Sequence, residues 1–338
     1  MLQMKTAFFE IQDWEKELLK RSSLAESGEL LFFQEELTEK NVEKAANCDL
    51  ISVFIYSQVT SKVIEKIPNL QFIATRSTGF DHIDIETCKK RNIQVANVPF
   101  YGENTVAEHT FALILSLSRN IHKAYVKTMR GDFSIEGLKG FDLKGKVLGV
   151  VGAGHIGLHV VKMARGFGME VLAYDVQKNS FMEEVLGFKY VSLEELLAQA
   201  DIISMHAPYN SKTHHLINKE NIQKIKRGSL LINTARGALV ETEALVQALD
   251  KGILSGAGLD ALEEENLIKE EKQILSSQFP REKLETLVRN HILLHRENVV
   301  ITPHIGFYSQ EALQRILETT IANLSSFLIH QPSHIVSQ

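Results

Sequence analysis

Short apolar runs alternate with amphipathic stretches along almost the whole chain of 338 residues, and this alternation limits the fold more than any other feature. The runs have the length of buried strands, and the stretches between them have helical spacing. We expect strands at residues 5–11, 29–33, 50–55, 71–75 and 94–98, and at 146–151, 170–174, 201–206, 229–233, 256–260 and 299–302. This order implies right-handed crossovers and parallel sheets with helices on both faces. The sequence therefore predicts an α/β protein.

The expected strands fall into two blocks, one before about residue 100 and one after about residue 145. The length of the chain also favours two domains. We predict two doubly wound parallel-sheet domains, Rossmann-like or flavodoxin-like, with an active-site cleft between them. The last helix, at 309–330, is assigned to the first domain, which becomes discontinuous. The predicted domains are 1–103 plus 304–338, and 104–303.

The longest helical pattern covers residues 105–129 and predicts a single helix. A shorter helix is expected at 192–199, where Ser192 and Glu195 could form a capping box. Residues 267–297 are rich in charge and lack a strand pattern. We interpret them as a helical insertion at the surface.

Composition excludes several classes of protein. A hydrophobic content of 44% and a charged content of 23% are ordinary for a globular chain, and a net charge of -5 argues against a nucleic-acid binder. Neither a signal peptide nor a membrane span is expected, and no metal. Cys48 and Cys88 are far apart and predict buried free thiols. We therefore expect a soluble cytoplasmic protein.

A glycine pattern follows the expected strand at 146–151. Gly152, Gly154 and Gly157 open the next helix, and Asp175 ends the following strand about 20 residues later. These glycines permit a tight turn, approach of a pyrophosphate to the backbone, and close packing of helix on strand. A carboxylate at the second strand accepts hydrogen bonds from ribose hydroxyls and repels a 2′-phosphate. The pattern predicts a site for NAD rather than NADP.

Three side chains later in the chain have complementary chemistry. Arg236 follows an expected strand and can hold a carboxylate with its planar fork, His304 can donate a proton near neutral pH, and Glu265 could orient that histidine. Together they could grip the carboxylate of a 2-oxo acid, polarise its ketone and donate a proton to the new hydroxyl, while the nicotinamide cofactor supplies the hydride. Each residue alone more often has a structural role, so the hypothesis depends on their combination. Four other histidines are assigned ordinary structural roles: His109, His122, His214 and His215.

With these motifs the chain resembles the D-isomer-specific 2-hydroxyacid dehydrogenase family along essentially its whole length. The matching segments are 76–84, 151–157, 234–237, 258–265 and 302–306. Arg236, Glu265 and His304 fall at the family's catalytic positions. The resemblance is closest to the D-lactate dehydrogenase branch. It implies NADH-dependent reduction of a 2-oxo acid to a D-2-hydroxy acid, with pyruvate to D-lactate as the leading expectation.

The resemblance also implies roles for further residues. The backbone amides of Thr78 and Gly79 would bind the substrate carboxylate, and Tyr56, Tyr101 and Tyr308 would border the substrate. Asp260 would hold the nicotinamide carboxamide. The full set implied to bind the cofactor is Gly152, Gly154, His155, Ile156, Gly157, Asp175, Ala207, Pro208, Thr213, Thr234, Ala235 and Asp260. Many relatives carry an arginine where this chain has His155.

Two alternatives stay open. The enzyme could reduce a bulkier 2-oxo acid, branched or aromatic, because the sequence does not give the volume of the pocket. In a different class, the chain could be an NAD-sensing scaffold resembling a corepressor. The family resemblance further implies a homodimer formed through the helix at 105–129.

Overall fold

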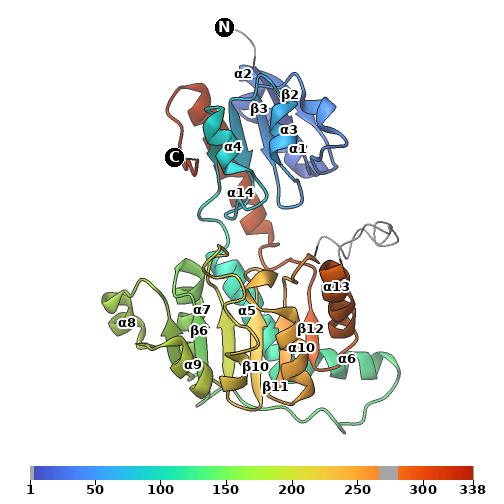
Figure 1. Ribbon diagram of the computed structural model, residues 1–338, viewed down its shortest axis with the longest axis vertical. Helices are drawn as coiled ribbons and strands as arrows, with labels where there is room; N and C mark the ends of the chain where they lie inside the picture. Colours follow the sequence, from blue (N-terminus) through green and yellow to red (C-terminus); the bar gives the residue numbers. More distant parts are fainter. Residues whose placement is uncertain (1–3, 266–280, 338) are drawn as a thin grey trace. The chain divides into compact units, whose positions relative to one another are not determined.

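The computed structural model describes residues 4–265 and 281–337 and divides the chain into two compact units (Figure 1). Unit 1 comprises Met1–Tyr101 and Ser309–Gln338, and unit 2 comprises Gly102–Tyr308. The predicted boundaries lay after residues 103 and 303, whereas the structure has them after Tyr101 and Tyr308. His304 therefore belongs to unit 2, together with Arg236 and Glu265.

Unit 1 contains a five-stranded parallel sheet with the strand order β2-β1-β3-β4-β5. The strands are β1 (Met4–Phe8), β2 (Gly28–Phe32), β3 (Leu50–Val53), β4 (Phe72–Thr75) and β5 (Gln94–Ala96). This order is that of flavodoxin-like domains, as predicted.

Both faces of this sheet are buried, because successive side chains of a strand point to opposite sides. Ala7 joins the core on one face and Phe8 the core on the other. The first core includes η1 (Val42–Ala45), α3 (Ser61–Glu65) and α4 (Ile85–Lys90); the second includes α1 (Asp13–Arg21), α2 (Leu24–Ser27) and α14 (Gln310–Leu328). The rings of Phe72 in β4 and Phe327 in α14 stack at 4.5 Å. Figure 1 shows α14 among the blue elements of unit 1.

Unit 2 contains a seven-stranded parallel sheet with the order β12-β11-β10-β9-β6-β7-β8. Its strands are β6 (Val147–Val151), β7 (Glu170–Tyr174), β8 (Lys189–Tyr190), β9 (Ile202–Met205), β10 (Ser229–Asn233), β11 (Leu254–Leu259) and β12 (Val299–Ile301). The first strand of the unit, β6, pairs with β7 on one side and with β9 on the other. The strand order therefore reverses at β6, which is where open parallel sheets bind ligands.

Helices cover both faces of the second sheet as well (Figure 1). One core contains residues of α5 (Glu103–Ser118) and α7 (His155–Gly166), with α8 (Ser180–Leu186) packed against it. The other contains residues of α9 (Leu193–Gln199), η2 (Ile222–Lys224), η3 (Gly237–Leu239), α10 (Thr242–Asp250) and α13 (Arg281–Leu294). The prediction of two doubly wound α/β domains is confirmed.

The structure corrects three local expectations. The helix predicted at 105–129 is two helices, α5 and α6 (Ile121–Met129), because Asn120 has a left-handed φ of 53° that ends regular helix. The short strand β8 was not predicted. At α9, Ser192 accepts a hydrogen bond from the Glu195 amide, which is one half of the expected capping box. Of the predicted insertion, α13 is helical, and residues 266–280 lie outside the described residues.

Two expectations from composition can be compared with the structure. Among the described residues, none of the helices combines the length and the apolar character that a membrane span needs. Cys48 and Cys88 are free and buried, as predicted. Burial raises the pKa of the Cys48 thiol to about 11 and that of Cys88 to about 12, so both stay protonated and unreactive.

Candidate active site

The predicted cofactor and catalytic residues of unit 2 follow six strands of one parallel sheet. Because these strands are parallel, their carboxyl ends meet at one edge. The residues lie one or two positions after a strand end. They are Gly152 after β6, Asp175 after β7, Ala207 after β9, Thr234 after β10, Asp260 after β11 and Thr302 after β12. The sheet therefore gathers residues that are up to 150 positions apart in the chain.

The glycine turn after β6 leaves room for a phosphate. Gly152 has a φ of 98°, and a Cβ there would lie 2.5 Å from the Ala207 amide nitrogen. A Cβ on Gly157 would lie 2.1 Å from the Gly152 carbonyl oxygen. By contrast, a Cβ on Gly154 would meet nothing within 4 Å, so the turn is open on that side. Two glycines hold the turn tight, and the third leaves its backbone open to a ligand.

Helix α7 begins directly at this opening. Its N-cap is Gly154, which offers no side chain to cap the first amides, and the helix has 12 residues. Those amides and the helix dipole favour an anion. Asp175 accepts hydrogen bonds from Ala153 N (2.8 Å) and Gln177 N (2.8 Å), and its carboxylate oxygens have further lone pairs for ribose hydroxyls. The residues present thus fit a dinucleotide with an unmodified ribose.

The other predicted cofactor residues lie in turns at the same edge. Ala207 and Pro208 follow β9, and Thr213 Oγ1 closes their turn by donating to the Pro208 carbonyl at 2.7 Å. After β10, the Thr234 hydroxyl lies 2.9 Å from that of Thr110 in α5. His155 and Ile156 are the first two residues of α7.

Arg236 lies in a turn that Asn233 holds from both sides. The Asn233 side chain accepts from Ala235 N at 3.1 Å and donates to the Arg236 carbonyl at 2.9 Å. Arg236 Nη1 donates to the Ala235 carbonyl at 3.0 Å. The guanidinium is half-buried, always charged and planar, which suits bidentate binding of a carboxylate.

His304 and Glu265 form a close pair. His304 Nδ1 lies 2.7 Å from Glu265 Oε1, and their side chains are 16% and 28% exposed. Leu262 N donates to the other oxygen of Glu265 at 3.3 Å. His304 has a φ of 57°, a conformation found at strained functional positions. This is the contact that the sequence analysis expected; the catalytic roles stay a prediction.

Asp260 is a buried carboxylate that accepts several hydrogen bonds from the protein. Its side chain is 2% exposed, and it accepts from Thr302 Oγ1 (2.6 Å), Ile305 N (2.9 Å) and Gly306 N (2.7 Å). Burial works against its charged form, but the hydrogen bonds of His109 and these donors outweigh burial and lower the pKa of Asp260. The carboxylate thus anchors the segment that carries His304. Its expected contact with the nicotinamide stays a prediction.

The predicted carboxylate-binding residues of unit 1 follow β4. The Thr78 carbonyl accepts from Asn97 Nδ2 at 2.8 Å, and the Gly79 carbonyl accepts from Ser77 Oγ at 2.6 Å. In a trans peptide the N–H points opposite to the C=O, so the Gly79 amide is directed away from Asn97. Thr78 is exposed and Gly79 half-buried. Binding of the substrate carboxylate by the amides of this turn stays a prediction.

The three predicted substrate tyrosines lie in separate segments. In unit 1, the Tyr56 amide donates to Glu10 at 3.0 Å, and the Tyr101 carbonyl accepts from Arg315 Nε at 2.7 Å. In unit 2, Tyr308 is 51% exposed and its ring packs edge-on against Phe307. The described contacts fix the backbones of these residues and leave their predicted roles untested.

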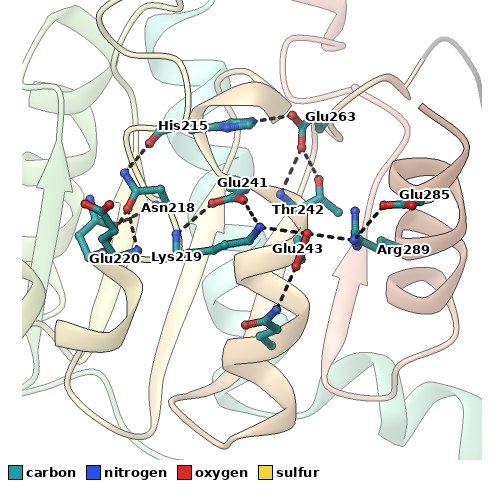
Figure 2. A network of polar contacts seen from close by, with 12 residues as sticks. His215, Asn218, Lys219, Glu220, Glu241, Thr242, Glu243, Glu263, Glu285 and Arg289 are labelled. Carbon is teal, nitrogen blue, oxygen red and sulfur yellow. Dashed lines mark hydrogen bonds and ion pairs between the residues drawn. The ribbon is translucent and has the colours of Figure 1, made fainter. Parts of the chain in front are cut away.

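Two histidines assigned ordinary roles by sequence are in fact paired with carboxylates. His109 Nε2 lies 3.3 Å from Asp260, and His215 Nε2 lies 2.6 Å from Glu263 (Figure 2). Asp260, Glu263 and Glu265 each pair with a different histidine within six consecutive residues. The run Asp260–Glu265 was a signal in the sequence, but the histidine partners are too distant along the chain to be recognised from it.

Comparisons with known proteins show the family to which this chain belongs. Residues 111–306 match the family described as "D-isomer specific 2-hydroxyacid dehydrogenase, NAD binding domain". The D-lactate dehydrogenase of Escherichia coli is 33% identical over 328 residues, 96% of each chain. An aromatic 2-oxoacid reductase of Clostridium sporogenes is 38% identical over 289 residues, 84% of each chain. The structure of D-lactate dehydrogenase from Aquifex aeolicus with NAD and lactic acid superposes with a TM-score of 0.88 at 35% identity, covering 98% of this chain and 99% of that one.

The chain belongs to the D-isomer-specific 2-hydroxyacid dehydrogenase family. It is an NAD-dependent D-2-hydroxyacid dehydrogenase, and the open glycine turn at α7 with Asp175 at the end of β7 fits that cofactor.

Proposed function

We propose that this enzyme reduces pyruvate to D-lactate with NADH. The observation that carries the proposal is the 2.7 Å contact between Glu265 and His304 in the unit that also holds Arg236. A carboxylate on Nδ1 fixes the orientation of the imidazole ring. Nε2 is then the ring nitrogen that can act on a substrate.

The residues divide the reaction among them. Bound NADH supplies a hydride to the carbonyl carbon. Arg236 holds the substrate carboxylate and polarises the ketone. The amides of Thr78 and Gly79 are the carboxylate donors that we propose in unit 1. As the C–H bond forms, the carbonyl π electrons move to oxygen, which takes the proton from His304 Nε2. Glu265 keeps the ring oriented throughout.

The side chain of the substrate is the less constrained part of the proposal. Similarity to the D-lactate dehydrogenases of Escherichia coli and Aquifex aeolicus favours pyruvate. The aromatic 2-oxoacid reductase of Clostridium sporogenes favours a second candidate, a bulky 2-oxo acid. Tyr56, Tyr101 and Tyr308 are the proposed neighbours of that side chain.

A panel of 2-oxo acids separates these candidates. NADH oxidation is measured with pyruvate, a branched 2-oxo acid and phenylpyruvate, and the product is assigned by a chiral assay. We expect the highest kcat/KM with pyruvate and a D product. A higher kcat/KM with phenylpyruvate than with pyruvate would show that the preferred substrate is a bulky 2-oxo acid, with the same mechanism. NADH binding without turnover on any acid would contradict the proposal and favour a scaffold.

We also propose that the enzyme is a homodimer. Large apolar side chains are exposed on α6 and the segment after it: Ile121, Tyr125, Met129, Phe133 and Ile135. An apolar surface of this kind is typical of an interface between subunits. Light scattering should give twice the chain mass of 38.1 kDa, and Tyr125→Lys should lower it. A native monomer at micromolar concentration would contradict this proposal.

A further inference from the structure

Glu263 is a mostly buried carboxylate that lies two residues before Glu265 and has no part in the proposed chemistry. Its side chain is 15% exposed. It accepts hydrogen bonds from His215 Nε2 (2.6 Å), Thr242 N (3.1 Å) and Thr242 Oγ1 (2.7 Å), as Figure 2 shows. Burial works against its charged form, but the bonds from His215 and Thr242 outweigh burial and lower the pKa of Glu263. Glu263 is therefore an ionised anchor.

The donors come from two segments that are themselves joined. His215 lies in the loop after β9, and Thr242 begins α10. The His215 amide donates at 2.8 Å to the Ala238 carbonyl, which belongs to the segment from Arg236 to Thr242. Glu263 thus connects its own segment to the one that carries Arg236.

A second contact joins the same two segments at the backbone. A Cβ on Gly237 would lie 2.0 Å from the Leu262 carbonyl carbon and 2.2 Å from the Glu263 amide nitrogen. Such an approach is possible only for glycine, since any side chain would push the segments apart. The residue after Arg236 therefore packs directly on the peptide that precedes Glu263.

Between the two glutamates, the backbone turns. Glu264 has a φ of 54°, so the chain changes direction between Glu263 and Glu265, which take different histidines as partners. A left-handed backbone is strained at any residue other than glycine. The Glu263 carboxylate on one side and Asn290 Nδ2, which donates to the Glu263 carbonyl at 2.8 Å, on the other hold this turn in place.

We propose that Glu263 is a positioning residue: bound by His215 and Thr242, it sets the spacing between Arg236 and Glu265 and so holds Glu265 against His304. This inference rests on the proposed function of those three residues. Glu263 does not contact the substrate in this proposal. It affects turnover through the position of Glu265.

A double-mutant cycle tests this transmission. The variants are Glu263→Gln, Glu265→Gln and the double variant, with kcat, the KM for the 2-oxo acid and NADH affinity measured for each. We expect Glu263→Gln to lower kcat about tenfold with NADH affinity unchanged, because a small displacement of a catalytic group is costly. In the Glu265→Gln background the same change should cost less than about twofold, since residues that act as a unit are not additive.

Three further variants guard against a trivial loss of fold. Thr242→Val removes the hydroxyl donor to Glu263 and should lower kcat. Thr242→Ser keeps that donor, so its kcat should stay close to that of the native enzyme. The Lys219 ammonium group forms ion pairs with Glu241 and Glu243, at 3.1 Å each (Figure 2). These pairs do not include Glu263, so Lys219→Gln is the matched control and should leave kcat within about twofold.

The outcomes separate this inference from the proposed function. Equal losses of kcat for Glu263→Gln in the native and Glu265→Gln backgrounds would overturn the positioning role. So would a fully active Glu263→Gln variant beside a slow Glu265→Gln variant. A fully active Glu265→Gln variant would overturn the proposed function and the positioning role with it.

Discussion

The two units hold the loops at the carboxyl edges of their sheets with different kinds of charge. In unit 1, Arg76 follows β4 and is 1% exposed; it donates to the carbonyls of Phe9 (2.6 Å) and Glu10 (2.9 Å). In unit 2, Asp260, Glu263 and Glu265 each pair with a histidine. An arginine can donate several hydrogen bonds from one side chain, whereas each of these histidines meets its carboxylate through one ring nitrogen.

The loop that carries Tyr56 shows how rigid the arrangement in unit 1 is. The Glu10 carboxylate accepts from the amides of Phe54, Tyr56 and Ser57, each at 3.0 Å. Glu10 itself has a left-handed φ of 56°, and its carbonyl is bound by Arg76. Unit 1 thus holds its loops with Arg76 and Glu10, whereas unit 2 holds the segment that carries Glu265 and His304 with pairs of a carboxylate and a histidine.

The largest effect that we expect in this comparison is on the stability of unit 1. Arg76→Met removes the guanidinium from a buried network that includes Glu15, whose oxygen lies 3.6 Å from Arg76 Nε. Removing one partner of such a pair costs about 3–5 kcal/mol, measured as the free energy of unfolding in urea. Lys5→Met, which breaks an exposed pair with Glu29, is the control and should have little effect. A loss below about 1 kcal/mol would contradict a supporting role for Arg76.

The second prediction is a smaller effect, a change in cofactor preference at Asp175. This carboxylate of unit 2 is held by two backbone amides and not by a histidine. Asp175→Ala removes the charge that repels a 2′-phosphate, so the ratio of kcat/KM for NADPH to that for NADH should rise at least about tenfold. Glu194→Ala, which removes a carboxylate of α9 whose side chain is 70% exposed, is the matched control. An unchanged ratio for Asp175→Ala would remove this residue from the ribose site.

The third prediction concerns how the stability of unit 2 depends on pH. The folded pKa values of Asp260 and Glu263 are lowered from 3.8 and 4.5, so both groups bind protons more readily in the unfolded chain. Their stabilisation is therefore fully present above about pH 4.5 and is lost as the pH falls through the folded pKa values. Thermal unfolding of the native chain and of Glu263→Gln should differ at pH 6 and converge towards pH 3. A constant difference would show that the charge of Glu263 does not contribute.

Sequence patterns predicted the strands well because the buried parallel strands are continuous apolar runs. They failed at Asn120, since its left-handed backbone ends a helix within a stretch whose apolar spacing does not change. Strand β8, with two residues, is too short to show a period.

Some residues of the candidate site were likewise recognisable from the sequence, and others were not. The glycine turn and the succession of Arg236, Glu265 and His304 are recognisable because each follows a strand end. The pairs of Asp260 with His109 and of Glu263 with His215 join residues 151 and 48 positions apart and depend on how the loops pack. Tertiary contacts of this kind leave no local pattern in one sequence.

The most direct test of the central claim is the turnover of His304→Ala with NADH and pyruvate. Without the proton donor, kcat should fall by about 10² to 10⁴-fold, while NADH binding, followed by fluorescence, stays native because the glycine turn and Asp175 are intact. That result is the one the account predicts. A His304→Ala variant with native kcat would contradict it, because no proton would then pass through the pair of His304 and Glu265.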